Sequence, residues 1–162
     1  MEEESYTPIP DFTGMGILSL KFLNNKNQQI WEIDIDNGLS TEITLNAVVG
    51  LTNALLNNLK YFQHYFIDLN IFDSVSGAYI WSQRISLPVQ TILTNNVHKL
   101  KISFKFTVNK SVKVRDKLIQ VNNIKLLLSH TSKHLDEMGH SESSRMGTFF
   151  TTELLVKDDA NE

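Results

Sequence analysis

Apolar and polar residues alternate along several short stretches of the chain, which is the pattern of half-buried β-strands. The longest alternation covers residues 100–108, where five apolar residues face one way and lysine, serine and threonine face the other. Shorter alternations predict five more strands, over residues 18–22, 31–36, 67–71, 79–87 and 150–156. Residues 73–77, which include Asp73, two serines and Gly77, predict a hairpin turn. Most connections are short, so the strands are expected to be antiparallel.

Two stretches follow helical spacing instead. Apolar residues recur at intervals of three and four between residues 45 and 62, and again over residues 124–138. Each stretch follows a serine, threonine or asparagine that can cap a helix, and Gly139 suits the end of the second. The expected fold is therefore α+β: one mainly antiparallel six-stranded sheet, possibly bent, with two helices packed on it.

The two ends of the chain differ from its middle. Residues 1–16 contain three glutamates, two prolines and two glycines, which predict a flexible acidic arm. Residues 17–157 hold every predicted element and are expected to form one globular domain. Residues 158–162 predict an acidic tail.

The composition excludes several classes of protein. The chain has no cysteine, so disulfides and thiolate chemistry are absent. No run approaches the roughly 18 apolar residues that a membrane span needs. The sequence begins with Met1 and three glutamates, unlike a basic secretion signal or presequence. We therefore expect a protein that is not secreted.

Signs of catalysis are few. No glycine-rich phosphate loop, nucleophile elbow or pair of buried carboxylates is visible in the sequence. His130 and His134 are four residues apart on a predicted helix, which is the spacing of zinc ligands, and Asp136, Glu137 or His140 could supply a third. Two solvent-exposed histidines near a helix end are a commoner explanation. We expect no enzyme activity, no metal, no cofactor and no small-molecule substrate.

Charge is distributed unevenly along the chain. Residues 98–133 carry nine basic groups and one acidic group, whereas residues 1–42 carry two basic and eight acidic groups. Alternate residues on a strand are about 7 Å apart, close to the phosphate spacing of a nucleic-acid strand. Lys99, Lys101 and Lys105 therefore predict a row that binds RNA phosphates or anionic lipid headgroups. A basic loop would extend this row with Lys110, Lys113, Arg115 and Lys117. The competing interpretation is that edge lysines only prevent aggregation.

Self-association is predicted from groups near the N-terminus. The arm carries apolar and aromatic anchors that gain free energy on burial against a neighbouring subunit. Acidic groups of the arm and of the strand over residues 31–36 could contact the basic stretch of that neighbour. The predicted contacts are Tyr6, Ile9, Phe12, Glu32, Asp34 and Asp36. A free tail, or an arm that folds back on its own domain, is the alternative.

The order of the predicted elements resembles that of rhabdovirus matrix proteins, in particular those of plant cytorhabdoviruses. The resemblance rests on the arm segment 6–12 with its tyrosine and two prolines, the strand ending in Leu87 and Pro88, and the long strand 100–108. It also uses the predicted helix 124–138 and the closing strand 149–156. The chain lacks the Pro-Pro-x-Tyr motif and the basic N-terminus of animal relatives.

This resemblance implies a structural protein of the viral matrix type. Such a protein would self-associate and link the viral nucleocapsid, through its RNA, to the anionic inner face of the envelope membrane. It would be found in the virion, in the host cytoplasm and at the inner membrane face. A non-catalytic protein–protein interaction module or adaptor is the alternative, and a metal-dependent enzyme using His130 and His134 is the least favoured reading.

Overall fold

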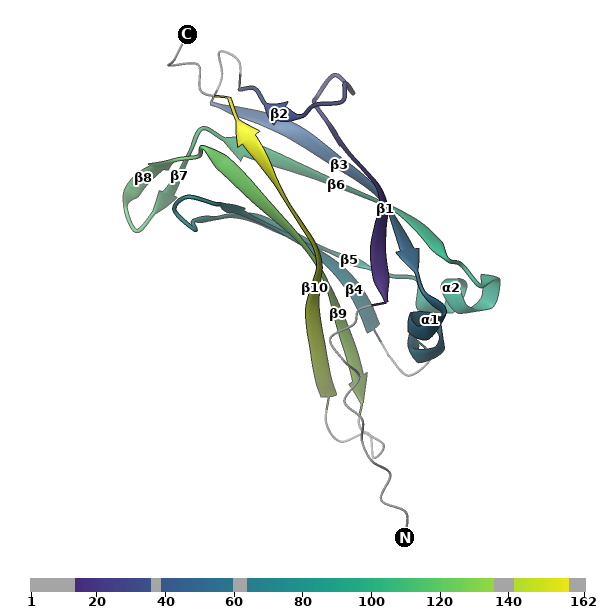
Figure 1. The fold of residues 1–162 in the computed structure, drawn as a ribbon. Helices are drawn as coiled ribbons and strands as arrows, with labels where there is room; N and C mark the ends of the chain where they lie inside the picture. The colour runs from purple at the N-terminus through teal and green to yellow at the C-terminus, as the bar shows by residue number, and fades with distance from the viewer. Residues whose placement is uncertain (1–13, 36–38, 60–63, 136–141, 158–162) are drawn as a thin grey trace.

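The computed structural model describes residues 14–35, 39–59, 64–135 and 142–157. These residues form two β-sheets packed face to face, with a projecting hairpin at one end and two short helices at the other (Figure 1). The described part of the chain is mostly strand. The predicted α+β fold, a single six-stranded sheet covered by two helices, is therefore wrong.

The smaller sheet has three antiparallel strands in the order β1-β3-β6. β1 is Met15–Leu23, β3 is Ser40–Leu51 and β6 is Lys99–Asn109. β3 lies in the middle, so β1 and β6 are the two edges. β6 pairs with β3 over its full length without a register shift.

The larger sheet has five strands in the order β2-β10-β9-β4-β5. They are β2 (Glu32–Ile33), β4 (His64–Asp73), β5 (Tyr79–Ser86), β9 (Asn123–Leu135) and β10 (Glu142–Val156). Only the short β2 is parallel to its neighbour. The hairpin consists of β7 (Ser111–Val114) and β8 (Lys117–Gln120).

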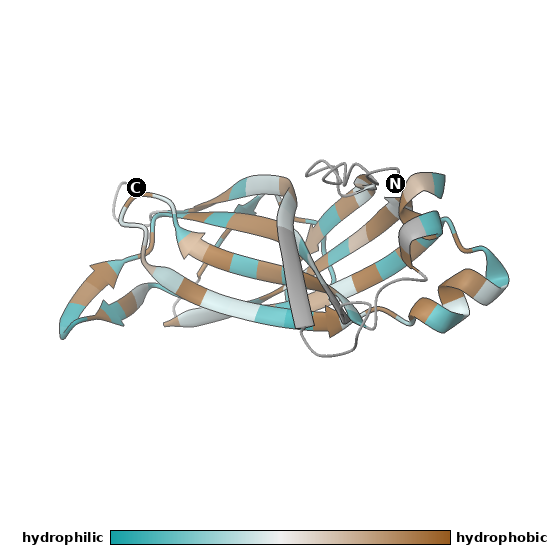
Figure 2. Ribbon diagram, turned by 90° about the horizontal axis from the view of Figure 1, so that it is seen from below, coloured by the Kyte–Doolittle hydropathy of each residue, from teal (hydrophilic) through white to brown (hydrophobic). Residues whose placement is uncertain are grey.

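The core lies between the two sheets and is made by the inward-facing residues of each strand. Ile67, Leu69 and Ile71 of β4 are fully buried, as are Phe104 and Val108 of β6. Figure 2 shows the resulting alternation of hydrophobic and hydrophilic bands along the strands. This alternation is the period of two that a half-buried strand requires.

The first predicted helix, over residues 45–62, is divided between the end of strand β3, which runs to Leu51, and a short helix that begins at Asn53. Inward-facing Leu45, Val49 and Leu51 are buried, and they alternate with Asn46 and Val48 on the outer face. The prediction placed Val48 and Val49 on one helical stripe, but the period of two also fits this segment. Valine favours strands because its branched side chain packs well on a pleated surface.

The second predicted helix is strand β9. Ile124, Leu126 and Leu128 point into the core, whereas Lys125 and Leu127 lie on the outer face. Three consecutive leucines satisfy both a helical and a strand period, so sequence spacing alone cannot separate the two structures. Pairing with β4 on one side and β10 on the other decides the outcome.

The two helices that do form are short. α1 (Asn53–Leu59) begins after Thr52, whose Oγ1 accepts a hydrogen bond from the backbone N–H of Leu55 at 3.3 Å. α2 (Val89–Asn95) follows Pro88 and buries Ile92. α2 joins β5 to β6 and was not predicted, because seven residues give too few turns for a clear period.

Two further differences concern the edges of the predicted elements. β1 begins at Met15, inside the range assigned to the arm, and a bulge between Ile17 and Ser19 turns Leu18 outward, where it is 58% exposed. The predicted basic loop is the β7–β8 hairpin, whose turn residues Arg115 and Asp116 have φ values of 49° and 65°. Positive φ at both central residues is the conformation of a type I′ turn, one of the two common two-residue hairpin turns.

Candidate functional site

The predicted lysine row lies on the outer face of the three-stranded sheet. Lys99, Lys101 and Lys105 of β6 are all exposed, and their even-numbered neighbours point into the core. The side chains therefore project on one face, Lys99 and Lys101 about 7 Å apart and Lys105 about 14 Å further along. The alternation over residues 100–108 placed these lysines on the exposed side of a strand, and the structure has them there. Their binding of phosphate stays a prediction.

A fourth lysine, which the sequence analysis did not include, joins this face from β1. The register pairs Ser103 with Asn46 of β3, and Asn46 with Lys21 of β1. Lys21 is exposed and lies two strands from β6, about 10 Å away. Its alternation with Leu20 and Phe22 could have placed it on a polar face, but only the strand order brings that face next to β6.

The four lysines form what we call the lysine face: Lys21, Lys99, Lys101 and Lys105. Within the part of the chain that the structure describes, their ammonium groups have no ion pair or hydrogen bond. Glu42 of β3 is the acidic residue on the outer face of the same sheet, opposite Thr107. The face therefore carries a local positive charge although the whole chain has a net charge of −3.

The remaining predicted basic residues are on or next to the hairpin. Lys110 links β6 to β7, while Lys113, Arg115 and Lys117 are exposed on the hairpin. Lys113 is 3.8 Å from Asp116 in a solvent-exposed ion pair, which contributes little to stability. The hairpin projects from the end of β6 and extends the basic surface away from the sandwich (Figure 1).

The predicted acidic contacts lie elsewhere. Glu32 and Asp34 are exposed, but they belong to the β2 edge of the other sheet, and Asp34 is 4.0 Å from Lys157. They do not pair with the lysines of the lysine face within the same chain. Asp36 and the arm anchors Tyr6, Ile9 and Phe12 lie outside the described residues.

The predicted histidine pair does not have zinc-ligand geometry. His130 and His134 both lie on strand β9, where residues four apart are about 13 Å apart along the strand. The Nδ1 of His130 lies 2.9 Å from the hydroxyl of Tyr65, and burial raises the pKa of that tyrosine. Among the described residues, no group of three potential ligands is close enough to hold a metal. Asp136, Glu137 and His140 lie outside those residues.

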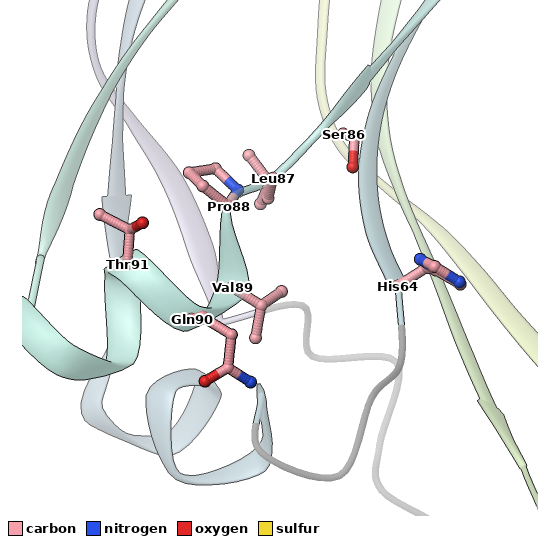
Figure 3. Close-up of a pocket in the computed structure, with 7 residues that line it drawn as sticks. All are labelled: His64, Ser86, Leu87, Pro88, Val89, Gln90 and Thr91. Carbon is pink, nitrogen blue, oxygen red and sulfur yellow. The ribbon is translucent and has the colours of Figure 1, made fainter.

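A surface cavity of about 360 Å³ lies where β5 leads into α2. Ser86, Leu87, Pro88, Val89, Gln90 and Thr91 line it together with His64 of β4. Figure 3 shows that the imidazole of His64 points away from Gln90 and Thr91, so these polar groups do not converge on one point. The lining contains no carboxylate, and the imidazole of His64 has no hydrogen bond to Ser86 or Thr91.

The outer face of the five-stranded sheet holds a polar network. The guanidinium of Arg84 donates to the carboxylate of Asp68 from Nε at 2.7 Å, and Thr131 donates to the same carboxylate at 2.7 Å. The guanidinium also lies over the ring of Phe66, 4.6 Å from its centre. Every charged group in this network has a partner, which is typical of a structural network.

Neither helix in the described residues is long and apolar enough to cross a lipid bilayer. No protein-family model matches the sequence, and no curated protein matches it. Among solved structures, the chain is similar to the C-terminal domain of wzt, with 12% sequence identity and a TM-score of 0.41. The similar region covers 90% of this chain and 75% of that one. A similarity this low carries no conclusion about function.

Proposed function

We propose that this protein is a non-catalytic module that binds the phosphates of single-stranded RNA along β6. The observation that supports the proposal is the lysine face, where Lys99, Lys101 and Lys105 project in a row without any intramolecular ion pair among the described residues. Their charge is therefore available to a ligand. Alternate residues on a strand are about 7 Å apart, which is close to the phosphate spacing along a nucleic-acid strand.

A linear polyanion fits this arrangement better than a membrane does. Three of the four lysines follow one strand, and the hairpin that comes after β6 in the chain carries Lys113, Arg115 and Lys117. A membrane surface would favour a two-dimensional cluster with several apolar side chains, but Leu18 is the large exposed apolar residue on this face among the described residues. No exposed aromatic side chain of the described residues stands in the row, so binding would not depend on base identity.

A matrix-type role is compatible with RNA binding, but the proposal does not depend on it. The resemblance to rhabdovirus matrix proteins uses a helix over residues 124–138, where the structure has strand β9. The link to an envelope and a virion therefore stays a prediction from sequence. The lysine face gives a physical basis only for the predicted binding of RNA phosphates.

The test compares two variants with the same change in net charge. K101Q/K105Q removes two cations from the lysine face, whereas K26Q/K125Q removes two exposed lysines from a turn and from the outer face of the other sheet. Fluorescence anisotropy with a labelled oligouridine measures affinity over a range of salt concentrations. We expect K101Q/K105Q to bind roughly tenfold more weakly at low salt, with a salt slope smaller by about 1.4. The control should bind almost as well as the wild type.

Two outcomes would overturn the proposal. Equal weakening of both variants would show that only the net charge matters. Binding to phosphatidylserine vesicles without binding to oligouridine would show that the lysine face recognises a membrane instead of a nucleic acid. The melting temperature of each variant should stay close to that of the wild type, because the substituted side chains are exposed.

A further inference from the structure

The outer edge of β6 is not paired with another strand. At the two ends of β6, the N–H of Leu51 donates to the carbonyl of His98 at 2.8 Å, and the N–H of Lys110 donates to the carbonyl of Leu39 at 2.9 Å. Residues 98 and 110 therefore bond to β3. Because the register is regular between them, every even-numbered residue of β6 bonds to β3, and every odd-numbered residue turns its N–H and C=O to the open edge.

The open edge belongs to the same residues that form the lysine row. The odd-numbered residues of β6 are all exposed, and there are six of them: Lys99, Lys101, Ser103, Lys105, Thr107 and Asn109. No backbone hydrogen bond to their edge groups occurs within the described residues. β5 of the other sheet approaches β6, with the rings of Trp81 and Phe106 centred 6.0 Å apart, but the two strands are not hydrogen-bonded.

The charges on this edge determine which strand could be added to it. A second β6 in antiparallel register about Ser103 would place Lys101 opposite Lys105, and like charges in direct cross-strand pairs are unfavourable. The lysines therefore oppose pairing with another copy of the same edge, as edge lysines commonly do. A strand with acidic side chains at alternate positions would instead place each carboxylate beside a lysine.

The other face of an added strand would meet apolar side chains. Leu100 at the edge of the core and Trp81 and Ile85 on β5 are only half-buried. An added strand extends the inner face of the three-stranded sheet toward these residues, so apolar side chains at its remaining positions would cover them. Charge and burial together specify a segment in which acidic and apolar residues alternate.

We propose that the open edge of β6 accepts an extended acidic–apolar segment of a partner protein by β-strand addition. The backbone groups of Lys101, Ser103 and Lys105 supply the hydrogen bonds, and the lysine side chains select the acidic residues. This inference goes beyond RNA binding because it uses backbone groups that a phosphate row does not need. If RNA also binds the lysine face, the segment and the RNA compete for the same lysines, which would let such a partner release the RNA.

The test separates edge pairing from simple charge attraction. Ser103→Pro removes an N–H that points to the open edge and bonds to nothing in β3, and proline is tolerated in edge strands at such positions. Ser103→Ala is the matched control. The probe is a labelled peptide of about eight residues with alternating glutamate and valine, an ordinary strand length. Its counterpart has the same composition with all glutamates before all valines.

The wild type and Ser103→Ala should bind the alternating peptide and discriminate against the block peptide. Ser103→Pro should lose at least about tenfold in affinity for the alternating peptide, because a strand cannot pair across the missing donor. It should bind oligouridine as the wild type does, since all four lysines remain. Circular dichroism and melting temperature establish that Ser103→Pro is folded.

Several results would contradict the inference. Equal peptide affinity of the proline and alanine variants, or equal affinity for the two peptides, would show that only charge is recognised. If Ser103→Pro does not fold, two N-methylated peptides replace it, one methylated on the backbone nitrogens of the glutamates and the other on those of the valines. Only one of these two sets of N–H groups can face β6, so equal binding of the two peptides would reject strand addition. The two proposals can also fail separately. If Ser103→Pro loses peptide binding and the wild type does not bind oligouridine, strand addition is supported and the RNA proposal is overturned.

Discussion

Arg84 and Asp68 face each other across β5 and β4, with the guanidinium Nε 2.7 Å from a carboxylate oxygen of the aspartate. The N–H of Leu87 donates to the carbonyl of Tyr65, which makes the pair of residues 68 and 84 one of the non-hydrogen-bonded positions of this ladder. Side chains are closest at such positions. Thr131 on β9 donates to the same carboxylate, so the contact connects three strands.

Breaking this ion pair should destabilise the fold measurably. Arg84→Met keeps an unbranched side chain over Phe66 but leaves the carboxylate of Asp68, whose side chain is only 11% exposed, with Thr131 as its partner. We expect a loss of about 1–2 kcal/mol in the free energy of unfolding, since Arg84 is itself 46% exposed and water can reach the site. Urea denaturation of Asp68→Ala, Arg84→Met and the double variant should give a coupling energy of about 1 kcal/mol. Additive effects would contradict a direct interaction.

Asp73 connects the β4–β5 turn to the start of β9 and should make stability depend on pH. Its carboxylate accepts hydrogen bonds from the N–H and hydroxyl of Ser76 and from the N–H groups of Asn122 and Asn123. Burial raises the pKa of Asp73, but these hydrogen bonds outweigh burial and hold its pKa below the usual value. The stabilisation is therefore complete above the unfolded pKa, about 3.9, and is lost as the pH falls through the lower folded value.

Asp73→Ala is expected to lower the free energy of unfolding by about 1.5–3 kcal/mol at pH 7, the range for hydrogen bonds to a charged group. The difference in the free energy of unfolding between Asp73→Ala and the wild type should become smaller only below about pH 4, where the carboxylate of the unfolded wild type becomes protonated. Urea titrations at several pH values measure it. A difference in the free energy of unfolding that grows as the pH falls from 7 to 5 would show instead that folding raises the pKa of Asp73.

Gly14 and Gly16 offer a matched pair of substitutions at the start of β1. Gly14 has a φ of 67°, and an added Cβ would lie 2.6 Å from the Cβ of Leu55 and 2.8 Å from Oγ1 of Thr52 in the α1 region. An added Cβ at Gly16 would meet nothing within 4 Å. Gly14→Ala should cost roughly 2 kcal/mol or more through backbone strain and displacement of α1, whereas Gly16→Ala should be nearly neutral. Thermal unfolding compares the two, and equal effects would place residue 14 outside the packed fold.

The leucines of β9 test the strand assignment directly. Leu126 and Leu128 are each 1% exposed, while Leu127 between them is half-buried on the outer face. Leu126→Ala and Leu128→Ala should each cost about 2–5 kcal/mol in the free energy of unfolding, and Leu127→Ala clearly less. Comparable losses at all three positions would contradict the period of two that β9 shows.

The sequence by itself determined the local features that need only one strand or one turn. The alternation over residues 100–108 predicted β6, and with it the solvent-exposed side of Lys99, Lys101 and Lys105. The turn-forming residues of the segment 73–77 predicted the β4–β5 turn, which the structure confirms through Asp73 and the positive φ of Gly77. In these segments the local sequence pattern fits only one structure, so pairing with neighbouring strands did not change it.

Tertiary structure decided the secondary structure of those segments whose local pattern fits both a helix and a strand. Residues 40–51 and 123–135 satisfy both a helical and a strand period, and they became central strands because each has a hydrogen-bonded partner on both sides. Strand order also brought Lys21 onto the lysine face and left the outer edge of β6 without a partner. Those features depend on which strands pair, and pairing between distant segments is set by burial of both sheets against each other, which no local pattern specifies.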